Sequence, residues 1–305
     1  MTDSRYRSLN EALRERFGEK LYKLTLNGGC TCPNRDGTLG TRGCIFCSEG
    51  GSGEFAASPL LSVREQIEDG KRRLAGKRPV RSYIAYFQAY TNTYAPVEHL
   101  RRIFTEAVSC PETAVLSIAT RPDCLGPEVL SLLEELNRIK PVWVELGLQT
   151  IHEKTAAFIR RGYPLPVFDR AMEELHKRGI ETVVHTILGL PGETDEMMLD
   201  TVRYVSRTKA SGIKLQLLHI LKHTDLADYY ERTGFHVLSR DEYVDLVIRC
   251  LEVCRPDLVI HRLTGDGPKD LLIAPEWSQA KRQVLNEIHK ELKRRDTWQG
   301  RLYVP

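Results

Sequence analysis

The sequence predicts an α/β fold, a partial (β/α)6-type TIM barrel with C-terminal additions. Strand-like and helix-like segments alternate along most of the 305 residues, which is typical of βαβ units in a parallel sheet. No Gly-x-Gly-x-x-Gly run opens a helical segment, so a doubly wound dinucleotide-binding fold is disfavoured. The length suits a single α/β barrel, because such barrels use about 200 residues or more.

The expected strands are short segments that are apolar or alternate between apolar and polar residues. The first, residues 20–27, alternates at period two, as a half-buried strand does. The others follow at 82–88, 113–119, 141–148, 181–188, 212–220 and 257–263.

The expected helices lie between these strands. Ser62 begins the helix at 62–75, because Glu65 stands three residues on, the spacing of a capping box. Pro96 opens the helix at 96–108 in a first-turn position. The pattern repeats at 126–138, 164–178, 194–208 and 239–254, and Val284, Leu285, Ile288 and Leu292 share one face of a last helix.

Composition limits the class of protein. The chain is 41% hydrophobic and 28% charged, which is typical of globular proteins and excludes disordered and fibrous classes. No apolar run approaches the 18 or so residues that span a bilayer, and no apolar stretch follows the charges at the N-terminus. We therefore expect a cytoplasmic protein without a membrane partner. The net charge of +3 does not by itself indicate nucleic acid.

Eight cysteines are unevenly distributed. Cys30, Cys32, Cys44 and Cys47 are crowded together, which in a reducing compartment indicates a metal or cluster site rather than disulfides. The other four are expected to be buried structural residues, as free cysteines usually are: Cys110, Cys124, Cys250 and Cys254.

The crowded cysteines allow two kinds of site. Cys44 and Cys47 form a C-x2-C pair, and Cys32 or Cys30 supplies a third thiolate. Three thiolates and a glycine-rich loop suit an iron–sulfur cluster. A structural zinc ion held by all four cysteines is the alternative.

Polar or glycine-rich residues follow the expected strands, where a barrel places its functional groups. The amides of Gln88, Asn92 and Gln149 can both donate and accept hydrogen bonds, and Glu145 is placed to accept them from a ribose or an ammonium group. Gly189, in a loop that also contains Pro191, lets the backbone approach a ligand closely. Further strand-end groups are Thr120 to Asp123 and His219 to Thr224.

Several sequence motifs resemble those of one enzyme family. Cys32-Pro-Asn-Arg-Asp-Gly-Thr38 and Gly43-Cys-Ile-Phe-Cys-Ser48 resemble the cluster loop of radical S-adenosylmethionine (SAM) enzymes of the Elp3-like group, and most closely a bacterial family within it. The similarity continues through most of the chain, at residues 86–94, 120–123, 145–150, 185–194, 262–266 and 274–278.

The resemblance implies cofactors and their ligands. Cys32, Cys44 and Cys47 would bind a [4Fe-4S] cluster, with Cys30 left out, and Phe46 would pack on the adenine of S-adenosylmethionine. Reductive cleavage of S-adenosylmethionine then gives a 5′-deoxyadenosyl radical that abstracts a substrate hydrogen. An electron donor such as flavodoxin or ferredoxin is implied as well. No residue is identified as the catalytic acid or base.

The resemblance also implies a substrate. The Elp3-like group includes enzymes that act on wobble uridine in tRNA, and the bacterial family that this chain resembles is linked to a related wobble-uridine step. That step looks like removal of the carboxymethyl portion of a 5-carboxymethylaminomethyl side chain, which leaves the aminomethyl form. Two basic clusters are compatible with RNA: Lys71, Arg72, Arg73, Lys77, Arg78 and Arg81, and Lys290, Lys293, Arg294, Arg295 and Arg301. A radical SAM enzyme acting on a small metabolite is the alternative, and a zinc-stabilised RNA-binding protein is a third hypothesis.

We expect one catalytic body with an extension. Residues 1–263 are predicted to form the partial barrel, of the radical SAM kind, with the cluster loop at 28–53. Residues 264–305 are predicted to form a C-terminal extension that contains the basic amphipathic helix.

Overall fold

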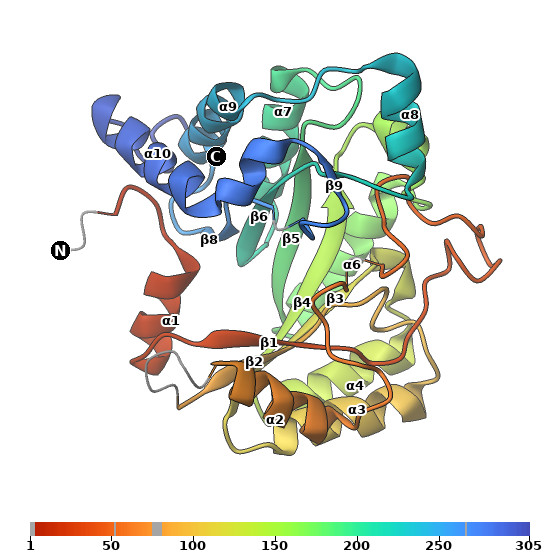
Figure 1. Cartoon of the computed structure of the whole chain (residues 1–305). Helices are drawn as coiled ribbons and strands as arrows, with labels where there is room; N and C mark the ends of the chain where they lie inside the picture. Colours follow the sequence, from red (N-terminus) through yellow and green to blue (C-terminus); the bar gives the residue numbers. More distant parts are fainter. Residues whose placement is uncertain (1–3, 52, 75–80, 266) are drawn as a thin grey trace.

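Seven strands of the described chain form one parallel sheet (Figure 1). The computed structural model describes residues 4–51, 53–74, 81–265 and 267–305. The strands lie side by side in the same order as in the sequence, β1-β2-β3-β4-β5-β6-β8. Their bounds are β1 Tyr22–Leu26, β2 Tyr83–Phe87, β3 Thr113–Thr120, β4 Val142–Gln149, β5 Glu181–Leu188, β6 Gly212–Leu217 and β8 Val259–Arg262.

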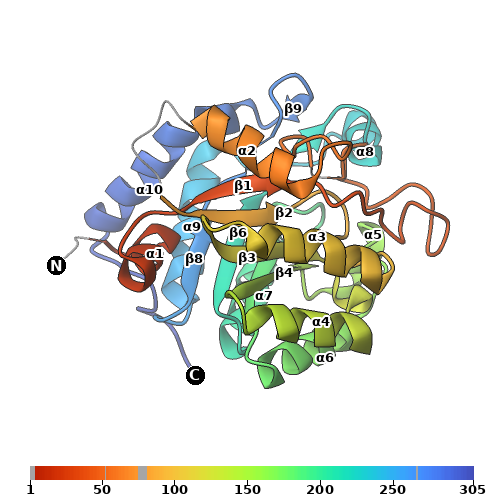
Figure 2. The same ribbon diagram turned by 90° about the horizontal axis from the view of Figure 1, so that it is seen from below.

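A helix follows each of the first six strands, so the chain forms six β/α units and closes with a seventh strand. These helices are α2 (Val63–Leu74), α3 (Val97–Ser109), α4 (Pro127–Asn137), α6 (Leu165–Lys177), α7 (Asp195–Arg207) and α9 (Arg240–Val253). The sheet curls into a half-barrel with the helices on its outer face (Figure 2). The predicted partial barrel is confirmed.

The alternation of side chains along the strands separates the outer core from the barrel interior. On β4, Val142, Val144, Leu146 and Leu148 belong to the large core beneath the helices. The alternate residues Trp143, Glu145, Gly147 and Gln149 face the other side of the sheet. Of these, Glu145 and Gln149, which lie toward the carboxyl end of the strand, are polar. On β4, polar residues of the barrel interior therefore alternate with apolar residues of the outer core.

Helix α1 (Leu9–Phe17) closes the amino end of the barrel, and the sequence analysis missed it. Ser8 caps it, accepting a hydrogen bond from the Glu11 amide while the Glu11 side chain accepts one from Ser8. Leu13 packs with Ile84 and Trp143 in a small core at this end of the barrel. The pocket described below therefore opens at the opposite, carboxyl end of the strands.

Three further differences from the expected elements occur around the carboxyl end. The strand predicted at 212–220 ends at Leu217, and Ile220–Leu221 forms β7, which pairs antiparallel with β9 (Leu272–Ala274). Two short helices, α5 (Glu153–Phe158) and α8 (Asp225–Thr233), were not expected. These helices have six and nine residues, too few for a periodic signal to stand out.

The C-terminal segment packs against the barrel. A 3-10 helix, η2 (Glu276–Ala280), leads into α10 (Lys281–Arg294), which buries Val284, Ile288 and Leu292, the face expected from the sequence, and lies against α9. The domain boundary at residue 263 stays a prediction. No described helix has the length and apolar character needed to cross a membrane.

Candidate functional site

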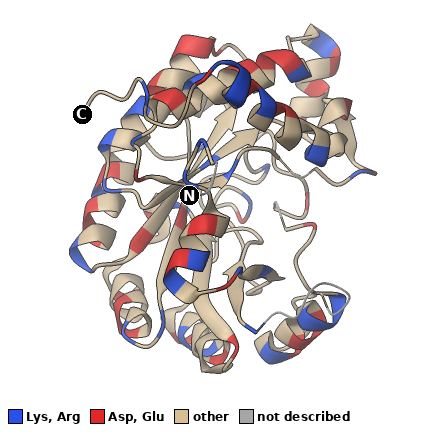
Figure 3. Cartoon of the chain, turned by 90° about the vertical axis from the view of Figure 1, so that its left-hand side faces the viewer, with Lys and Arg blue, Asp and Glu red and all other residues tan. Residues whose placement is uncertain are grey.

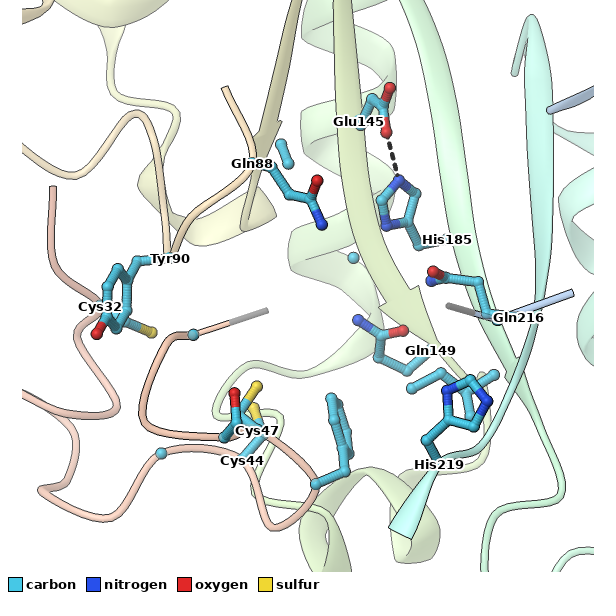
Figure 4. Close-up of a pocket in the computed structure, with 18 of the residues that line it drawn as sticks. Cys32, Cys44, Cys47, Gln88, Tyr90, Glu145, Gln149, His185, Gln216 and His219 are labelled. Carbon is cyan, nitrogen blue, oxygen red and sulfur yellow. Dashed lines mark hydrogen bonds and ion pairs between the residues drawn. The ribbon is translucent and has the colours of Figure 1, made fainter. Parts of the chain in front are cut away.

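A cavity of about 260 Å³ opens at the carboxyl ends of the strands and is lined by groups from the cysteine loop, the strands and the segment after β8 (Figure 4). Cys32, Cys44 and Cys47 line one end of it. In Figure 4 Glu145 and His185 lie at the other end. We call these the cysteine end and the pocket floor, the floor being defined as Tyr86, Glu145, His185, Lys214 and Arg262.

The residues after Cys32 fold the loop at the cysteine end. The amide of Arg35 donates to the carbonyl of Cys32 at 2.8 Å, which makes a tight turn directly after the first thiol. The Asn34 side-chain amide donates to the Cys44 sulfur at 3.5 Å and to the Arg160 carbonyl at 2.7 Å. Asn34 therefore ties the Cys44 thiol to the segment after α5.

Arg35 closes the other side of the loop. Its guanidinium donates to the carbonyl oxygens of Cys47 and Ser48, at 3.0 and 2.5 Å. Gly43 has φ +74°, and a Cβ there would come within 2.8 Å of the Arg35 Nε. Glycine is thus required beside the Arg35 clamp, and the loop residues between the cysteines have identifiable structural roles.

Positive charge lies near the Cys44 thiol. The hydrogen bond from the neighbouring Cys47 thiol, with the charge of Arg121 nearby, lowers the pKa of Cys44 to about 7 although burial opposes this. Arg121 is itself held by a bidentate pair with Asp123, at 2.9 and 2.7 Å. A low thiol pKa favours the thiolate form that binds iron.

The fourth crowded cysteine does not belong to the pocket. Cys30 is 7% exposed, packs in the large core, and burial raises its pKa to about 11. The three remaining thiols face one space from two sides, Cys32 from one and the Cys44–Cys47 pair from the other (Figure 4). Within the described ranges no three His, Cys, Asp or Glu side chains are grouped closely enough for a single metal ion. Cysteine thiolates are the usual ligands of iron–sulfur clusters, so Cys32, Cys44 and Cys47 could hold such a cluster.

The pocket floor is built from one inward residue on each of several strands. Glu145 is fully buried, and its two carboxylate oxygens accept hydrogen bonds from four side chains. These donors are Lys23 at 2.5 Å, Ser117 at 2.7 Å, His185 at 2.7 Å and Lys214. The sequence analysis named Glu145 as a cofactor-binding residue; that role stays a prediction, while the structure shows the carboxylate holding two lysines.

The electrostatics of the floor follow from burial around one carboxylate. Burial alone would raise the pKa of Glu145, but Lys214, Lys23 and the His185 hydrogen bond hold it well below its usual value. Burial and the charge of Lys214 lower the pKa of His185 to about 4, so the imidazole is neutral at pH 7. Burial also lowers the pKa of Lys214, and the neighbouring Lys23 and Arg262 add to this effect.

Amide side chains lie between the two ends. Gln88, Gln149 and Gln216 line the cavity, from β2, β4 and β6 (Figure 4). Gln149 has φ +68°, an unfavourable conformation for this residue type, and its buried Oε1 accepts no hydrogen bond from the described residues. A strained residue with an unsatisfied buried oxygen is a candidate for ligand binding.

Three of the seven predicted cofactor-binding residues do not line this pocket: Asn92, Gly189 and Pro191. Gly189 and Pro191 line a separate cavity beside Met198, bounded by the segment between α8 and α9. Asn92 is fully buried, and its amide donates to the Ala119 carbonyl at 3.0 Å, tying two strand ends together. Phe46, Gln88, Glu145 and Gln149 line the cysteine pocket. All seven assignments stay predictions.

Several residues of the site escaped the sequence analysis. Asn34, Arg35 and Arg121 were quoted only as parts of motifs, and Tyr86 and His185 were not singled out as site residues. Polar side chains at inward positions of otherwise apolar strands were the available signal, because such positions are filled by apolar residues unless a polar partner is present.

The basic clusters are largely paired with acids. Lys71 lies between Glu68 and Glu112, at 2.8 and 2.9 Å, and Arg73 pairs with Asp69 at 2.6 Å. On α10 the acidic partner of Arg294 and Arg295 is Glu291, and Lys77 and Arg78 of the first cluster lie outside the described residues. In the view of Figure 3, basic and acidic segments are interspersed over the helices.

Comparison with known proteins gives the family. The model of the radical SAM superfamily matches residues 36–205, and that of the radical SAM C-terminal domain matches residues 210–294. YtqA of Bacillus subtilis (strain 168) is 46% identical over 302 residues, covering 99% of this chain and 94% of YtqA.

Two more distant relatives are similar over part of their length. The tRNA uridine(34) acetyltransferase of Methanocaldococcus jannaschii is 24% identical over 176 residues, 55% of this chain and 32% of the acetyltransferase. The solved structure of Elp3 from Methanocaldococcus infernus, with an N-terminal deletion, superposes with a TM-score of 0.70 at 14% identity, covering 92% of this chain and 64% of that one. The structural likeness shows a shared fold. The family-model match over more than half of the chain shows that this protein belongs to the radical SAM superfamily, whose cofactors are a [4Fe-4S] cluster and S-adenosylmethionine.

Proposed function

We propose that this enzyme modifies the C5 side chain of the wobble uridine in tRNA, converting the carboxymethylaminomethyl group to the aminomethyl form. The observation that carries the proposal is a single pocket with three cysteine thiols at one end and, at the other, Lys214 and Arg262 near the buried Glu145 carboxylate. Such a pocket suits a slender substrate group that ends in an anion. The similarity to a tRNA uridine(34) acetyltransferase supports tRNA as the molecule that carries the group.

Residues of the cysteine end would hold the cofactors. Cys32, Cys44 and Cys47 would bind the cluster, and Phe46 would pack on the adenine of S-adenosylmethionine. When bound, these groups would supply a radical that abstracts a hydrogen atom, here from the carbon between the amine and the carboxylate. Loss of one electron from that carbon to the oxidised electron-transfer partner would leave an imine, and water would hydrolyse it to the aminomethyl group and glyoxylate. Gln149 would satisfy its free Oε1 by accepting a hydrogen bond from the ribose or the ammonium group of S-adenosylmethionine.

The barrel itself would protect this chemistry. The half-barrel is closed at its amino end by α1 and the apolar residues around Leu13 and Trp143. The pocket therefore opens toward the carboxyl end of the strands, where cofactor and substrate would bind. An electron donor of the flavodoxin or ferredoxin kind would reduce the enzyme.

The proposal is tested by the modified nucleosides of tRNA from cells with and without the gene. Without it, the carboxymethylaminomethyl uridine is expected to accumulate at the expense of the aminomethyl form. A gene encoding Cys44→Ala should fail to restore the wild-type pattern, and one encoding Cys124→Ala, outside the pocket lining, should restore it. An unchanged set of uridine derivatives would overturn the proposal, as would turnover of a small metabolite by a protein that does not bind tRNA.

A further inference from the structure

The sulfur of Cys44 accepts a hydrogen bond from a side chain that the proposed function does not use. Asn34 is 5% exposed, and its side-chain nitrogen lies 3.5 Å from the Cys44 Sγ and 2.7 Å from the carbonyl oxygen of Arg160. The Cys44 thiol in turn lies 3.5 Å from the same carbonyl oxygen. An amide NH2 group carries two hydrogens, so Asn34 can donate to both acceptors at once.

The orientation of this amide is fixed by a neighbour other than the sulfur. A carbonyl oxygen only accepts hydrogen bonds, so the amide atom that lies 2.7 Å from the Arg160 carbonyl oxygen is the nitrogen. The nitrogen of Asn34, and not its oxygen, therefore also faces the Cys44 sulfur.

The fold of the loop fixes the position of the amide as well. The Asn34 carbonyl accepts from the Gly43 amide at 2.8 Å, and the Pro33 carbonyl accepts from the Leu39 amide at 2.8 Å. On the far side, Gly162 has φ +84°, and a Cβ there would lie 2.7 Å from the Asn34 Oδ1. The donor is thus held beside the Cys44 sulfur by the folded chain itself.

Iron binding would leave this bond in place and strengthen it. Cysteine binds iron as the thiolate, which has no S–H to donate to the Arg160 carbonyl. The Asn34 N–H would then donate to an anionic sulfur, and hydrogen bonds to charged acceptors are stronger than neutral ones. Reduction adds negative charge to a cluster and its sulfurs, so a donor at a sulfur stabilises the reduced form more than the oxidised form. Hydrogen bonds to the sulfurs are among the features that set cluster potentials.

We propose that Asn34 is a positioning residue for the Cys44 thiolate and that its N–H···S hydrogen bond raises the reduction potential of the cluster. This inference rests on the assignment of Cys44 as a cluster ligand under the proposed function, and it does not depend on tRNA as the substrate. A higher potential makes the cluster easier to reduce by a flavodoxin- or ferredoxin-type donor. Asn34 thus acts on electron uptake and not on substrate recognition.

A redox titration of the reconstituted protein, followed by the EPR signal of the reduced cluster, tests the role of Asn34. At a fixed solution potential, Asn34→Ala should lower the ratio of reduced to oxidised cluster about tenfold, which is about 59 mV for one electron. A purely structural role would lower the amount of assembled cluster without moving its potential. An Asn34→Ala cluster with the wild-type potential would overturn the inference.

Asn137→Ala is the matched control. The Asn137 side-chain amide also donates to a backbone carbonyl, that of Gly179 at 3.2 Å, but it lies at the end of α4 and does not line the cavity. Its removal should leave the potential at the wild-type value.

A measurement on wild type covers the case in which Asn34→Ala assembles no cluster. Protein labelled with 15N in its asparagine side-chain amides should show a 15N nucleus coupled to the reduced cluster in pulsed EPR. The absence of that coupling would overturn the inference.

Cys44→Ala separates this inference from the ligand assignment. If Cys44→Ala keeps the iron content of wild type, the ligand assignment fails and the role of Asn34 fails with it. If Cys44→Ala loses its iron but the potential does not depend on Asn34, the assignment stands and the role of Asn34 alone is wrong. A lowered potential in Asn34→Ala supports the inference even where wild type leaves carboxymethylaminomethyl tRNA unconverted, a result that would overturn only the proposed substrate.

Discussion

The two ends of the pocket are built in different ways. The cysteine end comes from one continuous loop, in which Asn34 and Arg35 fix the positions of nearby thiols through bonds to side chain and backbone. The floor takes single residues from strands far apart in the sequence, such as Tyr86, Glu145 and Lys214. The positions of the thiols at the cysteine end therefore depend mainly on the conformation of one loop. The positions of the floor residues depend on how the strands of the barrel are aligned with one another.

This difference predicts that the largest effects will come from the cysteine end, and on cofactor content. Cys44→Ala should lower iron from about four per chain to near zero and abolish turnover, because each cluster thiolate is required. Cys30→Ala, which removes a thiol buried in the core, should keep its iron. Iron and sulfide analysis after anaerobic reconstitution measures both, and loss of iron in Cys30→Ala would reverse the ligand assignment.

At the floor, the largest expected effect is on folding. Glu145→Gln leaves the buried Lys214 and the partly exposed Lys23 beside a neutral group, and we expect the free energy of unfolding to fall by about 3–5 kcal/mol. Urea denaturation of the cofactor-free protein measures the change.

A double variant sharpens this test. Adding Lys214→Met to Glu145→Gln removes one of the uncompensated cations and should recover about 1–3 kcal/mol relative to additivity. Strictly additive losses would show that the two groups do not interact, and would remove the contrast between the floor and the loop.

Gln149 lies between the two ends of the pocket. Its substitution is expected to affect S-adenosylmethionine binding more than the stability of the protein. Gln149→Gly should weaken S-adenosylmethionine binding about tenfold, roughly 1.4 kcal/mol, because the unsatisfied Oε1 is lost. Stability should change by less than about 1 kcal/mol, since glycine adopts φ +68° without strain. Calorimetric titration and thermal unfolding measure the two quantities. A large loss of stability with normal binding would make Gln149 a structural residue.

The smallest expected effect is a pH dependence of stability from His185. Its pKa is about 4 in the folded protein and near 6.5 when unfolded, so below pH 6.5 the unfolded state gains a proton that the folded state does not. Stability should therefore fall as the pH drops, by about 1 kcal/mol from pH 6.5 to 5.5. His185→Gln should remove this component, leaving those of Glu145 and of His261, a residue of β8 whose pKa burial also lowers. The same slope in wild type and His185→Gln would contradict the neutral, buried imidazole.

The contrast between the two ends also explains what the sequence made predictable. The half-barrel followed from apolar periodicity, and the cysteine loop from the contiguous run Cys32 to Cys47. The charged floor did not, because pairing Lys23 with Glu145 requires strand register and barrel curvature, which no local pattern carries. Helix α1 was readable from its Ser8–Glu11 capping box but was overlooked. Gly189 and Pro191 lie outside the pocket because the loop after β5 turns toward α7 and the α8–α9 segment.

The most direct test of the central claim follows one hydrogen atom. The reconstituted enzyme would be given S-adenosylmethionine and carboxymethylaminomethyl tRNA that carries deuterium on the methylene between the amine and the carboxylate. We predict aminomethyl uridine and 5′-deoxyadenosine that is one mass unit heavier. Product formation with unlabelled 5′-deoxyadenosine, or labelled tRNA recovered intact while S-adenosylmethionine is consumed, would contradict the account.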